Sequence, residues 1–383
     1  MSGKIGIELC SFHPVHHGGK DQVAYNLLEG FRSINVDENM VCFAHKDLVP
    51  IIRKYNSQIK IVIVPKIRFP DRLNELRLLF IGVYIKYIAK KMDLDVILFT
   101  RKYSPAIKFS MTTVLIPHDV SVFFLGTIPG MNYSAKEAEK EKRRIKKDFE
   151  YRDYMIAISD FDKSEMYKYL PWASSKIKRI YNPIRFQENL IKINPDGFLT
   201  VLNVQWPHKN VITVLKAYAE IVGKIRNKLI IVGKFPENIF ELKKFVMEHG
   251  LEDNILFTGF VSDDELNDII EKTRIYINAS YFEGFGMTAV EMMGRGIPTI
   301  VANNTAMPEV TMGLCKYYGP TGDSHALAQT ILDELRNPQT AEQLCMISEA
   351  VRERYNIKGI ASEYWTFLNQ CSYVQNNSHT ERG

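Results

Sequence analysis

A strand, a turn and a helix follow one another in NASYFEGFGMTAVEMMGRGIPTIVANNTAMPEV, the stretch from Asn278 to Val310. We expect the turn to contain Gly284 and Gly286, and the helix to begin near Met287. The first backbone N–H groups of a helix have no partner within that helix. The amides of Phe285 to Thr288 therefore predict an anion site at the carboxyl end of the strand.

Two carboxylates accompany this helix start, since Glu283 lies in the predicted turn and Glu291 in the predicted helix. Carboxylates accept hydrogen bonds from hydroxyl groups, whereas free backbone amides donate to oxyanions. Together these groups suit a polyhydroxylated, phosphorylated ligand. Ordinary acidic residues beside a helix start are the alternative that the pair alone leaves open.

Short apolar runs rich in β-branched residues recur along both halves of the chain and alternate with longer amphipathic stretches. The first half contains KIGIEL, MVCFAH, KIVIVP, DVILFT, TTVLIPHD and YMIAIS, and the second contains FLTVLNV, LIIVGK, NILFTGF, IYINAS, PTIVAN and KYYGP. Almost entirely apolar strands that alternate with helices indicate parallel sheets covered on both faces. We therefore expect an α/β fold with two Rossmann-like, doubly wound domains that face an interdomain cleft.

The composition argues against several classes of protein. Of the 383 residues, 46% are hydrophobic and 24% are charged, which is usual for a globular protein. The five cysteines are scattered without C-x-x-C spacing, so we expect neither disulfides nor a zinc site and favour a reducing cytoplasm. The N-terminal MSGKIGIELC predicts a strand rather than a signal peptide, and the run from Leu78 to Ile85 is too short to span a bilayer.

Positive charge is concentrated in the first half of the chain. Residues 1–180 hold 30 lysines and arginines against 20 acidic residues, whereas the remaining residues hold 19 against 24. The first half therefore suits an anionic partner, such as a membrane surface, a nucleic acid or a phosphorylated substrate. Nucleic acid is the least favoured, because no helix-turn-helix pattern or aromatic-interleaved basic strand accompanies the charge.

Basic and apolar residues are mixed in a predicted helix at residues 68–91, RFPDRLNELRLLFIGVYIKYIAKK. Such a helix either docks shallowly on anionic lipid or belongs to the core with one solvated face. A second charged helix, at residues 135–153, mixes charges of both signs and indicates a solvated face.

The stretch from Glu283 to Val301 resembles the signature of retaining glycosyltransferases with two Rossmann-like domains, the GT-B architecture, in their family four. That signature has an acidic residue, G-F-G, four variable residues, E, a small- and Gly-rich turn, P and a strand. Further segments are similar in the family's order, namely AISDFDKSEM, YNPIRF, LNVQWPHKN, LIIVGK and ILFTGFVSDDELNDII. The resemblance covers nearly the whole chain and is strongest in the second half.

The resemblance, together with two prolines and several asparagines between residues 181 and 197, implies the domain organisation. We expect residues 1–185 to form an acceptor-binding domain and residues 186–358 to form a domain that binds a nucleotide sugar. A C-terminal helix, residues 359–375, is expected to cross back to the first domain. Residues 376–383 are expected to form a flexible tail.

The resemblance assigns roles to residues of the second half. Lys209 is expected to neutralise the leaving diphosphate, Glu283 to lie near the donor sugar and Glu291 to bind the ribose. The other donor-binding residues that the resemblance implies are Gly259, Phe260, Val261, Gly284, Phe285, Gly286, Met287 and Thr288.

One position departs from the family pattern. The family has an arginine five residues before the lysine, and Val204 stands there in this sequence. Either another basic residue replaces the missing charge, with Lys234 and Lys20 as options, or the diphosphate is held with one charge fewer.

Two glycines, Gly18 and Gly19, precede a predicted helix in PVHHGGKDQVAYNLLEGF. They predict a tight turn or, as the first-domain glycine loop of the family, a contact with the donor phosphate. The neighbouring His17 and Lys20 are candidates for acceptor binding or positioning.

A histidine and an aspartate, His118 and Asp119, end the strand LIPHDV. The resemblance places His118 among the catalytic residues in a positioning role, with Asp119 beside it. A retaining displacement without an enzymic nucleophile needs the donor phosphate as its internal base, so His118 is not expected to act as a general base. A satisfied His–Asp pair at a strand end is the alternative.

Together these features predict a nucleotide-sugar-dependent retaining hexosyltransferase of surface-polysaccharide or lipopolysaccharide assembly, cytoplasmic and peripheral on the inner face of the cell membrane. We expect no metal or other cofactor. The favoured donor is GDP-mannose, because PHKN and IPHD resemble segments of mannosyl- and rhamnosyltransferases. The favoured acceptor is a glycan or a polyprenyl-diphosphate-linked glycan.

Other functions remain open. One is a different GT-B enzyme, such as a sugar-nucleotide epimerase or a phosphorylase. Another is a non-catalytic nucleotide-sugar-binding subunit, for which Val204 is the main argument. A Rossmann dehydrogenase is the least favoured, because the glycine pattern near Gly18 lacks a third glycine.

Overall fold

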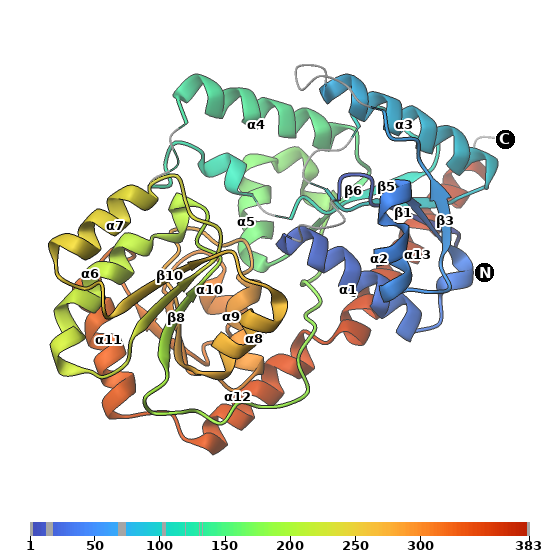
Figure 1. The fold of residues 1–383 in the computed structure, drawn as a ribbon. Helices are drawn as coiled ribbons and strands as arrows, with labels where there is room; N and C mark the ends of the chain where they lie inside the picture. Colours follow the sequence, from blue (N-terminus) through green and yellow to red (C-terminus); the bar gives the residue numbers. More distant parts are fainter. Residues whose placement is uncertain are drawn as a thin grey trace. The chain divides into compact units, whose positions relative to one another are not determined.

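The structure is a computed structural model that describes residues 3–12, 18–67, 74–101, 105–118, 120–129, 131 and 133–380. It contains two compact units, each built on one parallel sheet (Figure 1). Unit 1 comprises Met1–Phe123, Ala135–Arg185 and Tyr355–Gly383, and unit 2 comprises Phe124–Ser134 and Phe186–Arg354.

Unit 1 contains a seven-stranded sheet with the order β3-β2-β1-β4-β5-β6-β7. Its strands are β1 (Ile5–Glu8), β2 (Met40–Ala44), β3 (Lys60–Ile63), β4 (Val96–Phe99), β5 (Thr112–Leu115), β6 (Tyr154–Ala157) and β7 (Ile177–Arg179). Its helices are α1 (Gly19–Ser33), α2 (Val49–Tyr55), α3 (Asn74–Lys91), α4 (Ala135–Glu150), α5 (Asp160–Tyr169) and α13 (Ile357–Thr380). The inner strands β1, β2, β4 and β5 are buried along their whole length, whereas the edge strand β3 is partly exposed.

Unit 2 contains a six-stranded sheet with the order β10-β9-β8-β11-β12-β13. Its strands are β8 (Phe198–Leu202), β9 (Leu229–Val232), β10 (Ile255–Gly259), β11 (Thr273–Asn278), β12 (Thr299–Ala302) and β13 (Lys316–Tyr318). Its helices are α6 (Val211–Ile221), α7 (Ile239–Glu248), α8 (Asp263–Glu271), α9 (Met287–Gly294), α10 (Met307–Val310), α11 (Ser324–Arg336) and α12 (Ala341–Arg354).

Both sheets reverse their strand order next to their first strand. In unit 2 the chain adds β9 and β10 on one side of β8 and then adds β11, β12 and β13 on the other. The loops that leave β8 and β11 therefore diverge, and in open α/β sheets this point is where ligands bind. The parallel sheets and their order confirm the α/β, Rossmann-like fold class that the apolar runs predict.

The core of unit 2 fixes β8 and β11 beside each other. Leu199 and Val201 of β8 lie in one apolar cluster with Ile275 and Ile277 of β11, and none of the four is more than 3% exposed. Tyr218 of α6 packs into the same cluster and donates its hydroxyl proton to the carbonyl of Asn227 at 2.9 Å. This core therefore holds in place the strand ends that carry the polar residues.

The chain returns to unit 1 after it has formed unit 2. The amide of Ile184 donates to the carbonyl of Tyr355 at 2.8 Å, so the outgoing and returning segments are joined by the backbone. Helix α13 then packs against α1, where a Cβ added to Gly30 would lie 2.5 Å from the Cβ of Ala361. The helix continues to Thr380, which is further than the end at residue 375 that the sequence predicts.

Candidate functional site

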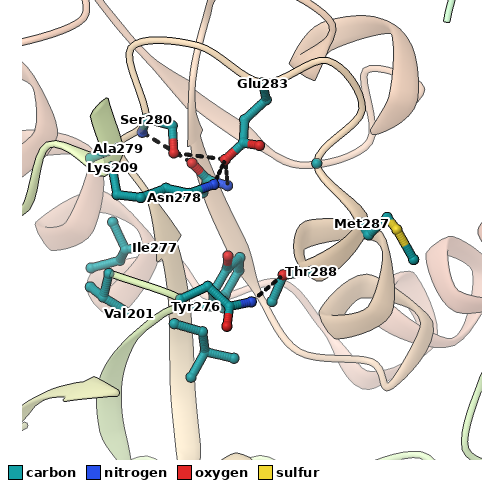
Figure 2. Close-up of a pocket in the computed structure, with 13 residues that line it drawn as sticks. Val201, Lys209, Tyr276, Ile277, Asn278, Ala279, Ser280, Glu283, Met287 and Thr288 are labelled. Atoms are coloured by element: carbon teal, nitrogen blue, oxygen red, sulfur yellow. Dashed lines mark hydrogen bonds and ion pairs between the residues drawn. The ribbon is translucent and has the colours of Figure 1, made fainter. Parts of the chain in front are cut away.

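A small pocket lies at the carboxyl ends of β8 and β11 in unit 2 (Figure 2). Its walls come from the two strand ends, from the loop that follows β8 and from the turn that leads into α9. The residues that line it are Val201, Leu202, Asn203, Lys209, Tyr276, Ile277, Asn278, Ala279, Ser280, Glu283, Gly286, Met287 and Thr288. The strand reversal described above therefore produces a pocket with a charged and amide-rich wall.

An ion pair between Lys209 and Glu283 forms part of the pocket wall. The Nζ atom of Lys209 lies 2.7 Å from Oε1 of Glu283, and the two side chains are 19% and 13% exposed. Ser280 Oγ donates to the same oxygen at 2.7 Å, and Asn278 Nδ2 donates to it at 3.3 Å. Figure 2 shows these three side chains converging on the Glu283 carboxylate from β11 and from the loop after β8.

The charge of Glu283 results from two opposing effects. Burial alone would raise the pKa of this carboxyl, because it disfavours the charged form. The ammonium of Lys209 and the hydroxyl of Ser280 stabilise the carboxylate and hold its pKa below the usual value. Glu283 is therefore a carboxylate at neutral pH, and it orients the lysine ammonium within the pocket.

The loop between β8 and α6 is held in place by backbone and amide contacts. Lys209 ends a short 3-10 helix, Pro207–Lys209, and the next residue, Asn210, adopts a left-handed conformation with φ 57°. The Nδ2 atom of Asn210 donates to the carbonyl of Ala279 at 3.0 Å, and the amide of Tyr281 donates to the carbonyl of His208 at 2.8 Å. These contacts fix the lysine relative to β11.

The turn before α9 needs glycine at Gly286. This residue has φ 86°, and a Cβ at this position would lie 2.6 Å from the sulfur of Met307. Its carbonyl accepts the amides of Ala289 and Val290, so the helical ladder begins after Met287 and Thr288, which line the pocket. The helix start predicted from the sequence is thus at the pocket wall.

Three further polar residues belong to the site, although they were not among the candidates from the sequence. Asn203 follows β8 with φ 61° and donates from Nδ2 to the hydroxyl of Thr288 at 3.1 Å. Tyr276 is 2% exposed and lines the pocket from β11. Thr305 accepts the amide of Glu283 at 3.2 Å and so supports the turn from outside. Asn203 and Thr305 follow the ends of β8 and β12, which is the signal that could have identified them, whereas Tyr276 lies within β11.

Glu291 lies one helical turn beyond the pocket, on α9. Burial raises the pKa of this carboxyl from 4.5 to about 7, against the opposing charge of Arg295. The carboxyl is therefore partly protonated at neutral pH in the structure as it stands. Its assignment to the ribose stays a prediction.

Val204 lies in the hydrophobic core and is only 2% exposed. The position that is arginine in the family pattern therefore contributes packing here, and it brings no charge to the pocket. Lys234 is exposed after β9, where Gly233 has φ 132° and a Cβ would lie 3.1 Å from the amide nitrogen of Val204. Lys234 thus follows the neighbouring strand at the same edge of the sheet, outside the residues that line the pocket.

The predicted base-binding loop lies at the end of β10, also outside the pocket lining. Gly259 ends this strand with φ 72°, and a Cβ there would lie 3.3 Å from the ring of Phe235. Phe260 and Phe235 are 78% and 42% exposed, and Val261 is half-buried. Two exposed aromatic rings therefore stand next to a backbone that only glycine adopts easily.

The candidates of the first half lie in unit 1. Gly18 precedes α1, whose first residue is Gly19, and its amide donates to the carboxylate of Asp21 at 3.1 Å. Lys20 is exposed, with its Nζ 5.5 Å from the centre of the Phe12 ring. The backbone amide that precedes α1 thus donates to the Asp21 carboxylate of the same helix.

His118 follows β5 with φ 68°, and its Nε2 lies 3.0 Å from the carbonyl oxygen of Thr100. His17 and Asp119, the other two candidates, lie outside the described residues. Near the strand reversal of unit 1, a buried ion pair joins Arg101 to Glu8, which also accepts the amide of Cys10 at 2.7 Å. No sequence pattern indicated this pair, because each partner lies alone beside an apolar run.

Residues 185–353 match the family model described as glycosyl transferases group 1. This segment of the chain belongs to that family. It contains the whole pocket, from Val201 to Thr288. The family assignment made from the sequence is thus confirmed.

Curated relatives and solved structures resemble the chain over different lengths. The serotype-specific mannosyltransferase WbdA of Escherichia coli is 28% identical over 180 residues, which are 43% of this chain and 22% of that protein. The O-antigen chain mannosyltransferase B of Escherichia coli is 25% identical over 241 residues, 59% of this chain and 61% of that protein. The chain thus spans less than two thirds of these glycosyl transferases.

Solved structures resemble the whole fold. Sucrose-phosphate synthase from Thermosynechococcus elongatus has a TM-score of 0.74 at 18% identity, over 96% of this chain and 98% of that one. Anabaena Alr3699/HepE, in complex with UDP-glucose, has a TM-score of 0.72 at 18% identity, over 96% of this chain and all of that one. The GT-B architecture expected from the sequence is confirmed by these neighbours, and the likeness extends to the fold alone.

The raised pKa of Glu291 predicts how stability changes with pH. A carboxyl whose pKa is higher in the folded than in the unfolded state stabilises the fold below pH 4.5, and this contribution is lost as the pH rises through about 7. Glu291→Gln removes the titrating group. When the pH rises from 5 to 8, we expect the unfolding free energy of the wild type to fall by about 1–3 kcal/mol more than that of the variant.

Denaturant unfolding at both pH values measures this difference. Glu237→Gln is the matched control, because Glu237 is exposed and its substitution is expected to leave the pH dependence unchanged. If wild type and Glu291→Gln lost stability in parallel between pH 5 and pH 8, the raised pKa of Glu291 would be wrong.

Proposed function

We propose that this chain is a retaining glycosyltransferase that transfers a hexose from a nucleotide sugar to a glycan acceptor. The observation that carries the proposal is the Lys209–Glu283 pair in the glycosyl transferases group 1 segment. It combines a fixed cation, a carboxylate and a helix start in a small pocket at the strand reversal. A sugar diphosphate needs these three kinds of group.

The leaving group is the nucleoside diphosphate, whose negative charge grows as the glycosidic bond breaks. We assign its neutralisation to the Lys209 ammonium and to the amides at the start of α9. The ammonium is only partly exposed to water, so its attraction for the phosphate exceeds that of a surface lysine. The ion pair with Glu283 keeps it oriented before the donor binds.

The sugar hydroxyls are assigned to Glu283. Among the described residues, the side-chain donors to this carboxylate all contact Oε1, namely Lys209, Ser280 and Asn278. Oε2 is therefore the atom that we assign to the donor sugar. A carboxylate accepts hydrogen bonds from hydroxyl groups, and it also stabilises positive charge at the anomeric carbon as the leaving group departs.

The transfer step involves the anomeric carbon and two oxygens. The acceptor oxygen forms a bond to the anomeric carbon on the face that the diphosphate leaves, and the bond between that carbon and the phosphate oxygen breaks. The acceptor proton passes to the departing phosphate oxygen, which serves as internal base. In this step the chain's own residues bind the donor, orient it and neutralise the leaving group.

The donor that we propose is GDP-mannose. The support is that the relatives WbdA and O-antigen chain mannosyltransferase B are mannosyltransferases by name. The acceptor that we propose is a glycan or a polyprenyl-diphosphate-linked glycan in surface-polysaccharide assembly, bound by unit 1 at the cytoplasmic face of the membrane. His118, Gly18, Gly19 and Lys20 are assigned to donor contact and positioning in that unit.

One observation favours a second candidate, a non-catalytic nucleotide-sugar-binding subunit. Val204 is buried in the core, so the pocket has a single lysine where the family pattern has an arginine as well. A diphosphate bound by fewer charges is bound and activated less strongly. The two candidates differ in turnover rather than in binding.

Substitutions of the ion pair test the proposed function. Lys209→Met removes the cation that meets the leaving group, so we expect the rate constant for transfer from saturating donor to fall about 10²–10³-fold. Lys216→Met is the control, because Lys216 is exposed on α6. Release of nucleoside diphosphate in the presence of acceptor measures the rate, and circular dichroism verifies folding.

Two outcomes would contradict this assignment. If Lys209→Met, folded and saturated with donor, transferred sugar as fast as Lys216→Met, the lysine would have no catalytic role. If the wild type bound a nucleotide sugar but released no nucleoside diphosphate with any glycan acceptor, the non-catalytic candidate would replace the enzyme.

The donor is tested by ligand-induced stabilisation. A ligand that binds only the folded state raises the unfolding temperature, and the rise grows with the logarithm of the ligand concentration divided by Kd. We expect GDP and GDP-mannose to raise it in a concentration-dependent way, and UDP, dTDP and CMP sugars to have a smaller effect. Stabilisation by UDP compounds without a response to GDP compounds would overturn the donor assignment while leaving the reaction class intact.

A further inference from the structure

Helix α3 of unit 1 exposes a stripe of large apolar side chains. Leu76, Leu79, Val83 and Tyr87 are 48%, 43%, 54% and 65% exposed. They recur at intervals of three and four residues, so they lie on one face of the helix. We call this set the α3 stripe.

The opposite face of α3 packs against the core of unit 1. Ile81, Ile85 and Ala89 are at most 2% exposed, and a Cβ added to Gly82 would lie 2.5 Å from the Cβ of Pro105. The orientation of the helix is therefore fixed by close packing on its inner side. The α3 stripe is not needed for that packing, and a contiguous exposed apolar surface marks a site of interaction.

Positive charge flanks the stripe. From Arg77 to Lys91 the sequence contains four basic residues and no acidic one. Lys90 and Lys91 are exposed at the end of the helix, and Lys86 donates to the carbonyl of Lys108 at 2.7 Å. A surface that is apolar along its centre and basic at its border is complementary to lipid tails beneath anionic headgroups.

The neighbouring edge of the sheet extends this surface. Ile63 of the edge strand β3 is 41% exposed, and its carbonyl accepts the hydroxyl of Tyr84 from α3 at 3.3 Å. In Figure 1, α3 lies at the outer border of unit 1, away from its sheet centre. The helix is about 27 Å long at its 18 residues. Such a length suits contact along a plane.

We propose that the α3 stripe docks unit 1 on an anionic lipid bilayer, with α3 lying in the headgroup region parallel to the membrane. Leu79, Val83 and Tyr87 enter the boundary between headgroups and acyl chains, and Lys90 and Lys91 contact the lipid phosphates. In the part of the chain that the structure describes, no helix is long and apolar enough to cross a membrane. The binding that we propose is interfacial, and it does not depend on the transfer reaction.

Cosedimentation with lipid vesicles tests this surface directly. The vesicles contain phosphatidylglycerol and phosphatidylcholine in equal parts, and neutral vesicles contain phosphatidylcholine alone. We expect Val83→Ser/Tyr87→Ser to lower the partition coefficient on anionic vesicles about tenfold or more. We expect Lys90→Gln/Lys91→Gln to lower it about fivefold for each lysine on anionic vesicles and to have little effect on neutral ones.

Matched controls carry the same kinds of substitution on unit 2. Phe240→Ser/Met346→Ser removes two apolar side chains that are 84% and 69% exposed, and Lys216→Gln/Lys228→Gln removes two exposed lysines. All of the substituted side chains are exposed, so unfolding temperatures are expected to stay within a few degrees of the wild type.

The outcomes separate lipid from other partners. Loss of vesicle binding in the α3 variants, with binding retained in both controls, supports the proposal. Equal binding by wild type and Val83→Ser/Tyr87→Ser overturns it, as does an equal loss in the unit 2 controls. Self-association that Val83→Ser/Tyr87→Ser abolishes in light scattering, without vesicle binding by the wild type, would assign the stripe to a second copy and overturn the lipid assignment.

Discussion

The ion pair between Lys209 and Glu283 joins two loops that are 74 residues apart in the chain. It forms because β8 and β11 are neighbours in a parallel sheet, so that their carboxyl ends meet at one edge. An unpaired ammonium or carboxylate at this depth would be costly, and the 2.7 Å contact offsets that cost. Ser280 and Asn278 complete the shell and keep the charge on the carboxylate.

The surrounding structure holds the two residues of this pair in position. The apolar cluster of β8, β11 and α6 fixes the strand ends, and Asn210 and Gly286 give the two loops conformations that only certain residues adopt easily. The amides at the start of α9 then lie at the same wall as the charges. A site of this kind suits a ligand that is both anionic and rich in hydroxyl groups, because each group in it recognises one of those two features.

Sequence patterns were informative where local chemistry is decisive. The apolar runs predicted every strand of both sheets except β7, and the stretch around Gly286 predicted the helix start, because glycine and apolar periodicity act over a few residues. β7 was missed, since the three-residue strand Ile177–Arg179 is too short to have a period. Asn203 and Thr305 were missed for a different reason, because their contacts are made only when distant strand ends meet.

Two questions that the sequence left open are answered by the burial of side chains in the structure. Val204 stands where the family pattern has an arginine, and the structure shows that this position belongs to the core of unit 2. The helix that contains the α3 stripe was consistent with a core role or with lipid docking, and the structure shows that its apolar residues serve both faces, one packed and one exposed. Burial of individual side chains separates these cases, and burial is a property of the fold rather than of the local sequence.

We propose that Lys209 and Glu283 act as one unit on the donor. A double-mutant cycle of Lys209→Met, Glu283→Gln and the combined variant measures this most directly, with the single-turnover rate of transfer from saturating donor as the readout. We expect the combined variant to be about as slow as the slower single variant, because either substitution disrupts the same arrangement. Rate losses that multiply in the combined variant would contradict it, since the two residues would then contribute independently.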